Sequence, residues 1–159
     1  MQQDQITGYS EKLQIEKRYV TVTTKETLLE MVEAIEEASR ISLDTETTSL
    51  NPRKGKIIGF SITTKIGTGF YLPTLKWNNY TQKLEELLIE GKSTHNIAVR
   101  VMKMLKGKKL ICHNASFDLR YIKNYYGVSL IEDLWVDTAL LVHTVQEEGA
   151  GMGVFGLKP

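Results

Sequence analysis

The segment ISLDTETTSL, residues 41–50, is a short apolar run that ends in two acidic residues. Strand side chains two positions apart point to the same side, so Asp44 and Glu46 project together while Thr45 points the other way. Two carboxylates at a strand end are ligands suited to a hard divalent cation such as Mg²⁺ or Mn²⁺. The spacing fits a solvated strand end equally well, because a single short motif is weak.

A second polar pattern lies at residues 113–122, HNASFDLRYI, where a short predicted strand gives way to a helix. Asn114 and Asp118 are four positions apart, which places both side chains on one helix face beside an apolar stripe. A carboxylate that borders a buried stripe needs a partner. The alternative is structural: Asn114 caps the helix, and Asp118 gains from the positive end of the helix dipole.

The two segments together resemble the first two motifs of the DnaQ-like, or DEDD, 3′–5′ exonuclease superfamily. The match is closest to the proofreading domain of family A DNA polymerases, the bacterial polymerase I type. There the first motif is Asp-x-Glu, as in DTETTSL, and the second is Asn-x-x-x-(Phe/Tyr)-Asp, as in HNASFDL. The resemblance covers residues 18–159 and includes WVDTALL at 135–141 and GLKP at 156–159.

This resemblance implies removal of nucleotides from a 3′ DNA end with two divalent metal ions, Mg²⁺ or Mn²⁺. It implies that Asp44 binds both ions, Glu46 the first and Asp118 the second. Leu50, Asn114 and Phe117 match positions that line the terminal nucleotide. The implied partners are single-stranded DNA and a DNA polymerase domain, or the missing C-terminal part of the same protein.

One departure from the family pattern concerns the fourth carboxylate. The family carries it in a third motif, Tyr-x-x-x-Asp, on a later helix, and the sequence holds no counterpart. We therefore expect residues 18–159 to form an incomplete exonuclease domain with weak hydrolysis, preceded by a polar tail over residues 1–17. Two further interpretations stay open: an RNA-trimming exonuclease of the same superfamily, and a non-catalytic module that binds DNA or supports a polymerase.

Composition fits a single globular domain. The chain has 159 residues, 42% hydrophobic and 25% charged, and a formal net charge of +1. No apolar run approaches the roughly 20 residues needed to cross a bilayer, so we expect no membrane association and a cytoplasmic location. Cys112 is the only cysteine, which excludes an internal disulfide, and we expect it in the core.

Hydrophobic periodicity predicts the order of elements. We expect strands at 19–23, 41–46, 56–64, 70–72, 109–112 and 134–136, and helices at 24–39, 81–89, 96–105, 114–126 and 138–145. Three antiparallel strands followed by parallel strand-helix units predict an α/β fold with a mixed five-stranded sheet flanked by helices. The resemblance supplies its name, the ribonuclease H-like fold.

Several other residues have simpler explanations. Thr23 with Glu26 has the spacing of a capping box. Asp137 is expected to cap the helix that follows it. Trp77 and Trp135 are expected to be packing residues, and the three histidines lack the paired spacing of a zinc site. The segment 100–123 contains seven basic residues and one acidic residue. This composition predicts either a surface that binds a nucleic-acid strand or a solvated surface.

Overall fold

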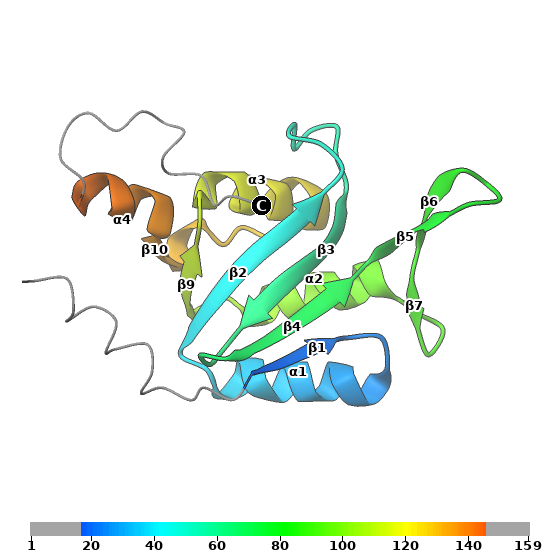
Figure 1. Ribbon diagram of the computed structural model, residues 1–159, viewed down its shortest axis with the longest axis horizontal. Coiled ribbons are helices and arrows are strands. Elements are labelled where there is room, and N and C mark those ends of the chain that lie inside the picture. The colour runs from blue at the N-terminus through cyan, green and yellow to red at the C-terminus, as the bar shows by residue number, and fades with distance from the viewer. Residues whose placement is uncertain (1–16, 146–159) are drawn as a thin grey trace, which may run out of the picture.

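The computed structural model describes residues 17–145, which form a mixed β-sheet with helices packed against it (Figure 1). The sheet has six strands in the order β1-β4-β3-β2-β9-β10. The pairs β2–β3 and β3–β4 are antiparallel, whereas β1–β4, β2–β9 and β9–β10 are parallel. Their bounds are β1 Arg18–Thr21, β2 Arg40–Thr47, β3 Ile57–Thr63, β4 Thr68–Pro73, β9 Lys109–Cys112 and β10 Leu134–Asp137.

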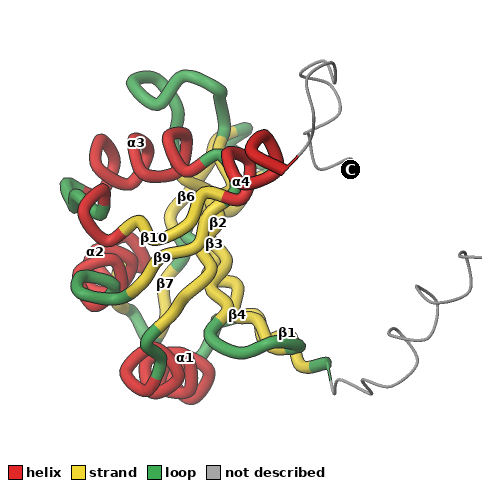
Figure 2. Tube along the Cα trace, turned by 90° about the vertical axis from the view of Figure 1, so that its left-hand side faces the viewer, coloured by secondary structure: helices red, strands yellow, loops and turns green. Residues whose placement is uncertain are grey.

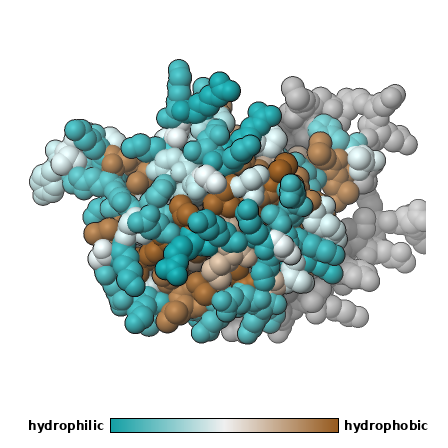
Figure 3. Space-filling model, turned by 180° about the vertical axis from the view of Figure 1, so that it is seen from behind, coloured by the Kyte–Doolittle hydropathy of each residue, from teal (hydrophilic) through white to brown (hydrophobic). Residues whose placement is uncertain are grey.

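Three helices cover a single side of this sheet (Figure 2). They are α1 (Lys25–Glu37), α2 (Thr94–Met104) and α3 (Ala115–Tyr126), while α4 (Thr138–Val145) follows β10 at the sheet edge. A 3₁₀ turn, Ile131–Asp133, precedes β10. The outer surface of the helical layer is largely hydrophilic, with hydrophobic residues between the polar ones (Figure 3).

The core lies between the sheet and these helices. Along β2, Ile41, Leu43 and Thr45 are buried, and the residues between them are exposed. The buried strand residues pack with helix residues such as Met31 and Ile122 in one hydrophobic cluster. Alternation thus directs one side of the sheet to the helices, as expected for a strand with one buried face.

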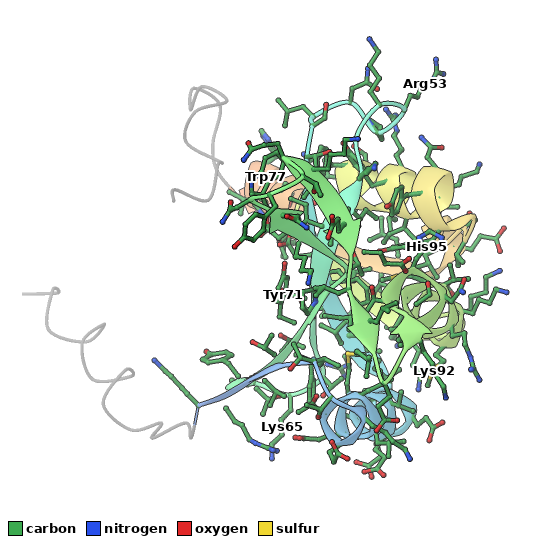
Figure 4. The ribbon with its side chains drawn as sticks, turned by 90° about the vertical axis from the view of Figure 1, so that its right-hand side faces the viewer. Arg53, Lys65, Tyr71, Trp77, Lys92 and His95 are labelled. Carbon is green, nitrogen blue, oxygen red and sulfur yellow. The ribbon has the colours of Figure 1, made fainter. Side chains whose placement is uncertain are left out.

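We call the opposite side of β2, β3 and β4 the open face, because no helix among residues 17–145 covers it (Figure 2). Asp44, Ser61 and Tyr71 are consecutive register partners across these three strands and lie on this face. Glu46 lies two residues beyond Asp44 on the same side of β2. Tyr71 projects away from the helices (Figure 4).

The predicted ribonuclease H-like fold class is confirmed, and the edge strand β1 adds a sixth strand to the expected five. The predicted polar tail over residues 1–17 lies almost wholly outside the described residues. The capping box is one residue later than expected. The Thr24 hydroxyl accepts from the Thr27 backbone N–H (3.3 Å), and the Thr27 hydroxyl accepts from the Thr24 backbone N–H (3.1 Å).

The helix predicted for residues 81–89 is wrong. These residues belong to strands β6 (Lys83–Glu86) and β7 (Leu88–Ile89), which pair with β5 (Leu75–Asn78) and β8 (Lys92–Ser93). Asn78 organises the first turn, since its Oδ1 accepts from the backbone N–H groups of Tyr80 (2.8 Å) and Thr81 (3.1 Å). This local side-chain bonding overrides the helix propensity of the following residues. The β5–β6 hairpin projects from the sheet (Figure 1).

Neither tryptophan is a packing residue of the core, contrary to prediction: Trp77 is 54% exposed and Trp135 is 48% exposed. Trp77 lies on the β5–β6 hairpin (Figure 4). Cys112 is buried as predicted. Across residues 17–145, we find no helix with the length and apolar character needed to span a bilayer.

Candidate active site

The end of strand β2 presents two acidic residues to the open face and one threonine to the core. Asp44 and Glu46 are exposed, whereas Thr45 between them is buried. The parallel pairing of β2 with β9 covers Arg40, Ile41 and Ser42 and stops before Asp44. The last residues of β2 therefore have a strand neighbour only on the β3 side, which leaves space for another element on the β9 side.

Helix α3 brings Asp118 to this position. Asp118 is in the first turn of α3 and is only 2% exposed. Its Oδ1 accepts two hydrogen bonds from Thr45, one from the backbone N–H (3.0 Å) and one from the hydroxyl (2.5 Å). The buried residue between Asp44 and Glu46 is thus the partner that the buried carboxylate requires.

The Asp118 carboxyl is difficult to ionise in this environment. Burial raises its pKa to about 6, and the nearby negative charge of Asp44 acts in the same direction, while the hydrogen bonds from Thr45 oppose the rise. Burial also raises the pKa of Asp44, and His113 partly offsets that rise. The two aspartates are therefore close enough to repel each other, and a bound cation would relieve this repulsion.

Glu46 lies near a tyrosine on the open face. The Tyr71 ring crosses Gly59, the register partner of Glu46 on β3, so closely that a Cβ at position 59 would overlap the phenol. Burial raises the pKa of Tyr71, and the charge of Glu46 raises it further. Glu46 is thus beside a phenol, whereas Asp118 contacts Thr45 on the core side.

Asn114 does not cap α3, so the structural alternative considered for it is wrong. Its backbone is left-handed (φ 58°), and its side chain makes no capping hydrogen bond. The Asp137 carboxylate caps the helix instead, accepting from the N–H groups of Asn114 (2.9 Å) and Ala115 (2.8 Å). It also accepts from Ala139 N–H (3.0 Å), as predicted for the start of α4. A non-glycine residue in this conformation is uncommon, and such residues cluster at functional sites.

Tyr121 contacts both Phe117 and the loop that carries Leu50. Leu50 is 88% exposed, in the loop after β2. The buried Tyr121 hydroxyl donates to the carbonyl oxygens of Ser49 and Asn51, the residues that flank Leu50. The Phe117 ring lies 5.1 Å from the Tyr121 ring, centroid to centroid. Tyr121 therefore fixes the Leu50 loop against α3, and its side-chain contacts were not evident from the sequence.

His113 was also missed by sequence reasoning as a member of this site. Its Nδ1 lies 2.9 Å from the Thr138 hydroxyl at the start of α4. His113 immediately precedes Asn114, and its electrostatic effect reaches Asp44. Its position directly before the second motif was the only available signal.

The donor chemistry fits a divalent metal ion in part. Asp44, Glu46 and Asp118 supply hard carboxylate oxygens, and the first and last of these repel each other without a cation. Within residues 17–145, however, no three His, Cys, Asp or Glu side chains converge closely enough to hold an ion. The site therefore contains two coupled aspartates and a nearby glutamate rather than a preassembled ligand cage.

The mixed sheet has a ribonuclease H-like fold, with two acidic residues near the end of strand β2 and a third on helix α3. A family model described as 3′–5′ exonuclease matches residues 19–148. The chain belongs to this 3′–5′ exonuclease family.

Individual relatives agree with this assignment. DNA polymerase I of Borreliella burgdorferi is 33% identical over 110 residues, which cover 67% of this chain and 11% of the relative. The chain thus spans a small fraction of that protein's length. Two solved structures share the fold at low identity. The Aedes aegypti Nibbler EXO domain has a TM-score of 0.59 at 11% identity, over 88% of this chain and 66% of that one. The POL domain of Pol1 from M. smegmatis, in complex with DNA primer-template and dNTP, has a TM-score of 0.55 at 18% identity. The match covers 81% of this chain and 20% of that one.

Proposed function

We propose that this chain is a metal-dependent 3′–5′ exonuclease domain that hydrolyses the 3′-terminal phosphodiester of a DNA strand, in proofreading for a polymerase. The observation that carries this proposal is the buried Asp118, bonded to Thr45 and electrostatically coupled to Asp44. A buried carboxylate with a raised pKa beside a second carboxylate is a costly arrangement in a purely structural role. A bound cation would offset the energetic cost of this carboxylate pair.

Each acid has a separate part in this proposal. Asp44 would bind both of two divalent ions, Mg²⁺ or Mn²⁺, Glu46 the first and Asp118 the second. When bound, such ions activate a water for attack on phosphorus and stabilise the charge of the departing 3′ oxygen. Thr45 positions Asp118 through two hydrogen bonds and so couples helix α3 to the end of β2.

Three further residues would bind the terminal nucleotide. Leu50 presents an exposed apolar side chain from a loop that Tyr121 anchors. Asn114 keeps its side-chain amide free of helix capping and available to a polar group of the sugar. Phe117 lies half-buried in the first turn of α3 and offers an aromatic surface.

The choice of DNA and of a polymerase partner rests on the family and on the similarity to DNA polymerase I. That relative is far longer than this chain, so the polymerase partner would be another domain or the remaining C-terminal part of the same protein. Since only three candidate acids are present and no three acids converge among the described residues, we expect slow hydrolysis by the 159-residue chain.

The test is a single-turnover assay with excess protein, Mn²⁺ and a 5′-labelled DNA strand, so that slow cleavage is detected. We expect a ladder of products shortened from the 3′ end, its loss in Asp44→Asn, and its retention in the control Glu33→Gln, which changes an exposed residue of α1. Equal cleavage by Asp44→Asn would contradict the proposal.

Two further experiments separate the alternative functions. One uses a matched RNA strand, and the other fuses the missing third motif to the chain. Faster trimming of RNA than DNA would favour the RNA-trimming alternative. If DNA binds but no cleavage appears, even after fusion of a segment that carries a Tyr-x-x-x-Asp helix, the chain is a non-catalytic module.

A further inference from the structure

A group of one aromatic and two cationic side chains lies where β2 and β9 begin. Arg40 and Lys109 are register partners on these neighbouring parallel strands. The Arg40 guanidinium carbon is 5.1 Å from the Trp135 ring centroid, and Lys109 Nζ is 5.2 Å from it. We refer to these three residues as the Arg40–Trp135–Lys109 cluster.

The positive charge of this cluster is not neutralised within the described chain. Residues 17–145 contain one salt bridge, Arg18–Glu30, so neither cation of the cluster is paired with a carboxylate. The nearby Asp133 instead accepts a hydrogen bond from the Gly107 N–H (2.7 Å). An aromatic ring attracts cations at exposed sites but leaves their net charge unchanged.

The adjacent lysine shows what a structural cation does in this region. Lys108 Nζ donates to the backbone oxygens of Glu36 (2.9 Å) and Ala38 (2.8 Å), which end helix α1. Arg40 and Lys109 make no such bonds and are both exposed, and Trp135 is 48% exposed. Two like charges held side by side on adjacent strands repel each other, and an anion between them removes that repulsion.

The position of the cluster relates it to the candidate active site. Arg40 lies on the same side of β2 as Asp44, four residues earlier, which corresponds to about 13 Å along a strand. Stacked nucleotides advance about 3.4 Å each along one strand of a duplex. A strand whose 3′ end is at Asp44 and which runs along the open face thus reaches Arg40 about four nucleotides from that end.

We propose that the Arg40–Trp135–Lys109 cluster binds the phosphodiester backbone of the nucleic-acid strand about four nucleotides upstream of its 3′ end. This inference rests on the proposed exonuclease function. Arg40 supplies the planar donors suited to phosphate oxygens, Lys109 adds a compact positive charge, and the exposed part of Trp135 contacts the adjoining base or sugar.

The test is a binding titration with single-stranded oligothymidylates of two and eight nucleotides, in chelator so that no strand is cleaved. A Trp77→Phe background makes Trp135 the only tryptophan, so its fluorescence reports directly on the cluster. The variants are Arg40→Gln, Lys109→Gln and the double substitution. The matched control is Lys103→Gln, an exposed lysine on the helix-covered side.

We expect the octamer, and not the dinucleotide, to change Trp135 emission. For the octamer, the slope of log affinity against log salt should decrease in magnitude by about 0.7 for each single substitution and about 1.4 for the double, with no change in the control. Unchanged slopes in the double variant would overturn the proposal. So would equal emission changes with inorganic phosphate, which would indicate a site for free anions.

The two proposals fail separately in this design. Binding is measured without cleavage, so an inactive chain can still show the length-dependent effect of the cluster. Normal metal-dependent cleavage with no effect of the double substitution on octamer affinity would refute the cluster alone.

Discussion

Replacing Asp118 with asparagine is expected to stabilise the protein at neutral pH in the absence of divalent ions. Burial and the charge of Asp44 raise the Asp118 pKa from 3.8 to about 6. For a carboxyl whose pKa is higher in the folded state, the stabilising effect of protonation is complete below about pH 4 and is lost as the pH rises through about 6. The ionised group then costs about 3 kcal/mol at pH 7.

Asparagine removes this charge while keeping the size of the side chain and an oxygen that can accept both Thr45 hydrogen bonds. The raised pKa already includes the strength of the Thr45 bonds to the carboxylate. The buried amide NH₂ group that replaces one carboxylate oxygen loses its hydration, which offsets about 1–2 kcal/mol. We therefore expect a net gain of about 1–2 kcal/mol in the free energy of unfolding at pH 7.5. For a domain of this size the gain corresponds to a Tm increase of roughly 2–8 °C.

The assay is scanning calorimetry of both proteins from pH 4 to pH 8 in chelator. The difference in unfolding free energy between variant and wild type should be near zero or slightly negative at pH 4 and should rise through pH 6. Glu33→Gln, which removes an exposed carboxylate on the solvent side of α1, serves as the matched control. A variant that is less stable than wild type at pH 7.5, or a difference independent of pH, would refute this reasoning.

Three other predictions concern metal binding, the contact of Gly55 with Tyr121 and the cap that Asp137 provides. Mg²⁺ or Mn²⁺ should raise the Tm of the wild type in a thermal-shift assay, and Asp44→Ala should abolish the increase; an equal shift in the variant argues against the site. Gly55→Ala should cost about 1–3 kcal/mol by chemical denaturation, because its Cβ would overlap the Tyr121 phenol, and the loss should be smaller in a Tyr121→Phe background. Asp137→Ala should cost about 1–2 kcal/mol by removing the cap of α3, with Asp137→Asn less damaging; equal losses for the two would contradict a capping role.

Local patterns in the sequence were sufficient to predict most of the fold. Alternation along residues 41–46 correctly assigned Asp44 and Glu46 to one side of a strand, and apolar periodicity located α2, α3 and α4 to within two residues. The helix prediction for 81–89 failed because the helix-forming residues of β6 pair with β5 across a turn that Asn78 organises. Such pairing depends on a neighbouring strand, which periodicity within the segment does not register.

The contacts within the candidate site were less accessible to sequence reasoning. The sequence indicated that Asp118 needed a partner, but Thr45 lies 73 positions away and its role depends on how α3 packs. Asp137 was expected to cap α4, the helix that follows it. It caps α3 as well, because β9, which leads into α3, is adjacent to β10. Tyr121 and the loop around Leu50 meet only in the folded chain.

The central claim is that Asp44, Glu46 and Asp118 share a site for divalent cations, and Mn²⁺ anomalous diffraction from crystals of this protein tests it most directly. We predict an anomalous peak that marks a Mn²⁺ ion bound to carboxylate oxygens of Asp44 and Glu46, with the Asp118 side chain turned toward the same ion. Peaks confined to other parts of the surface, with Asp118 still bonded only to Thr45, would contradict the claim.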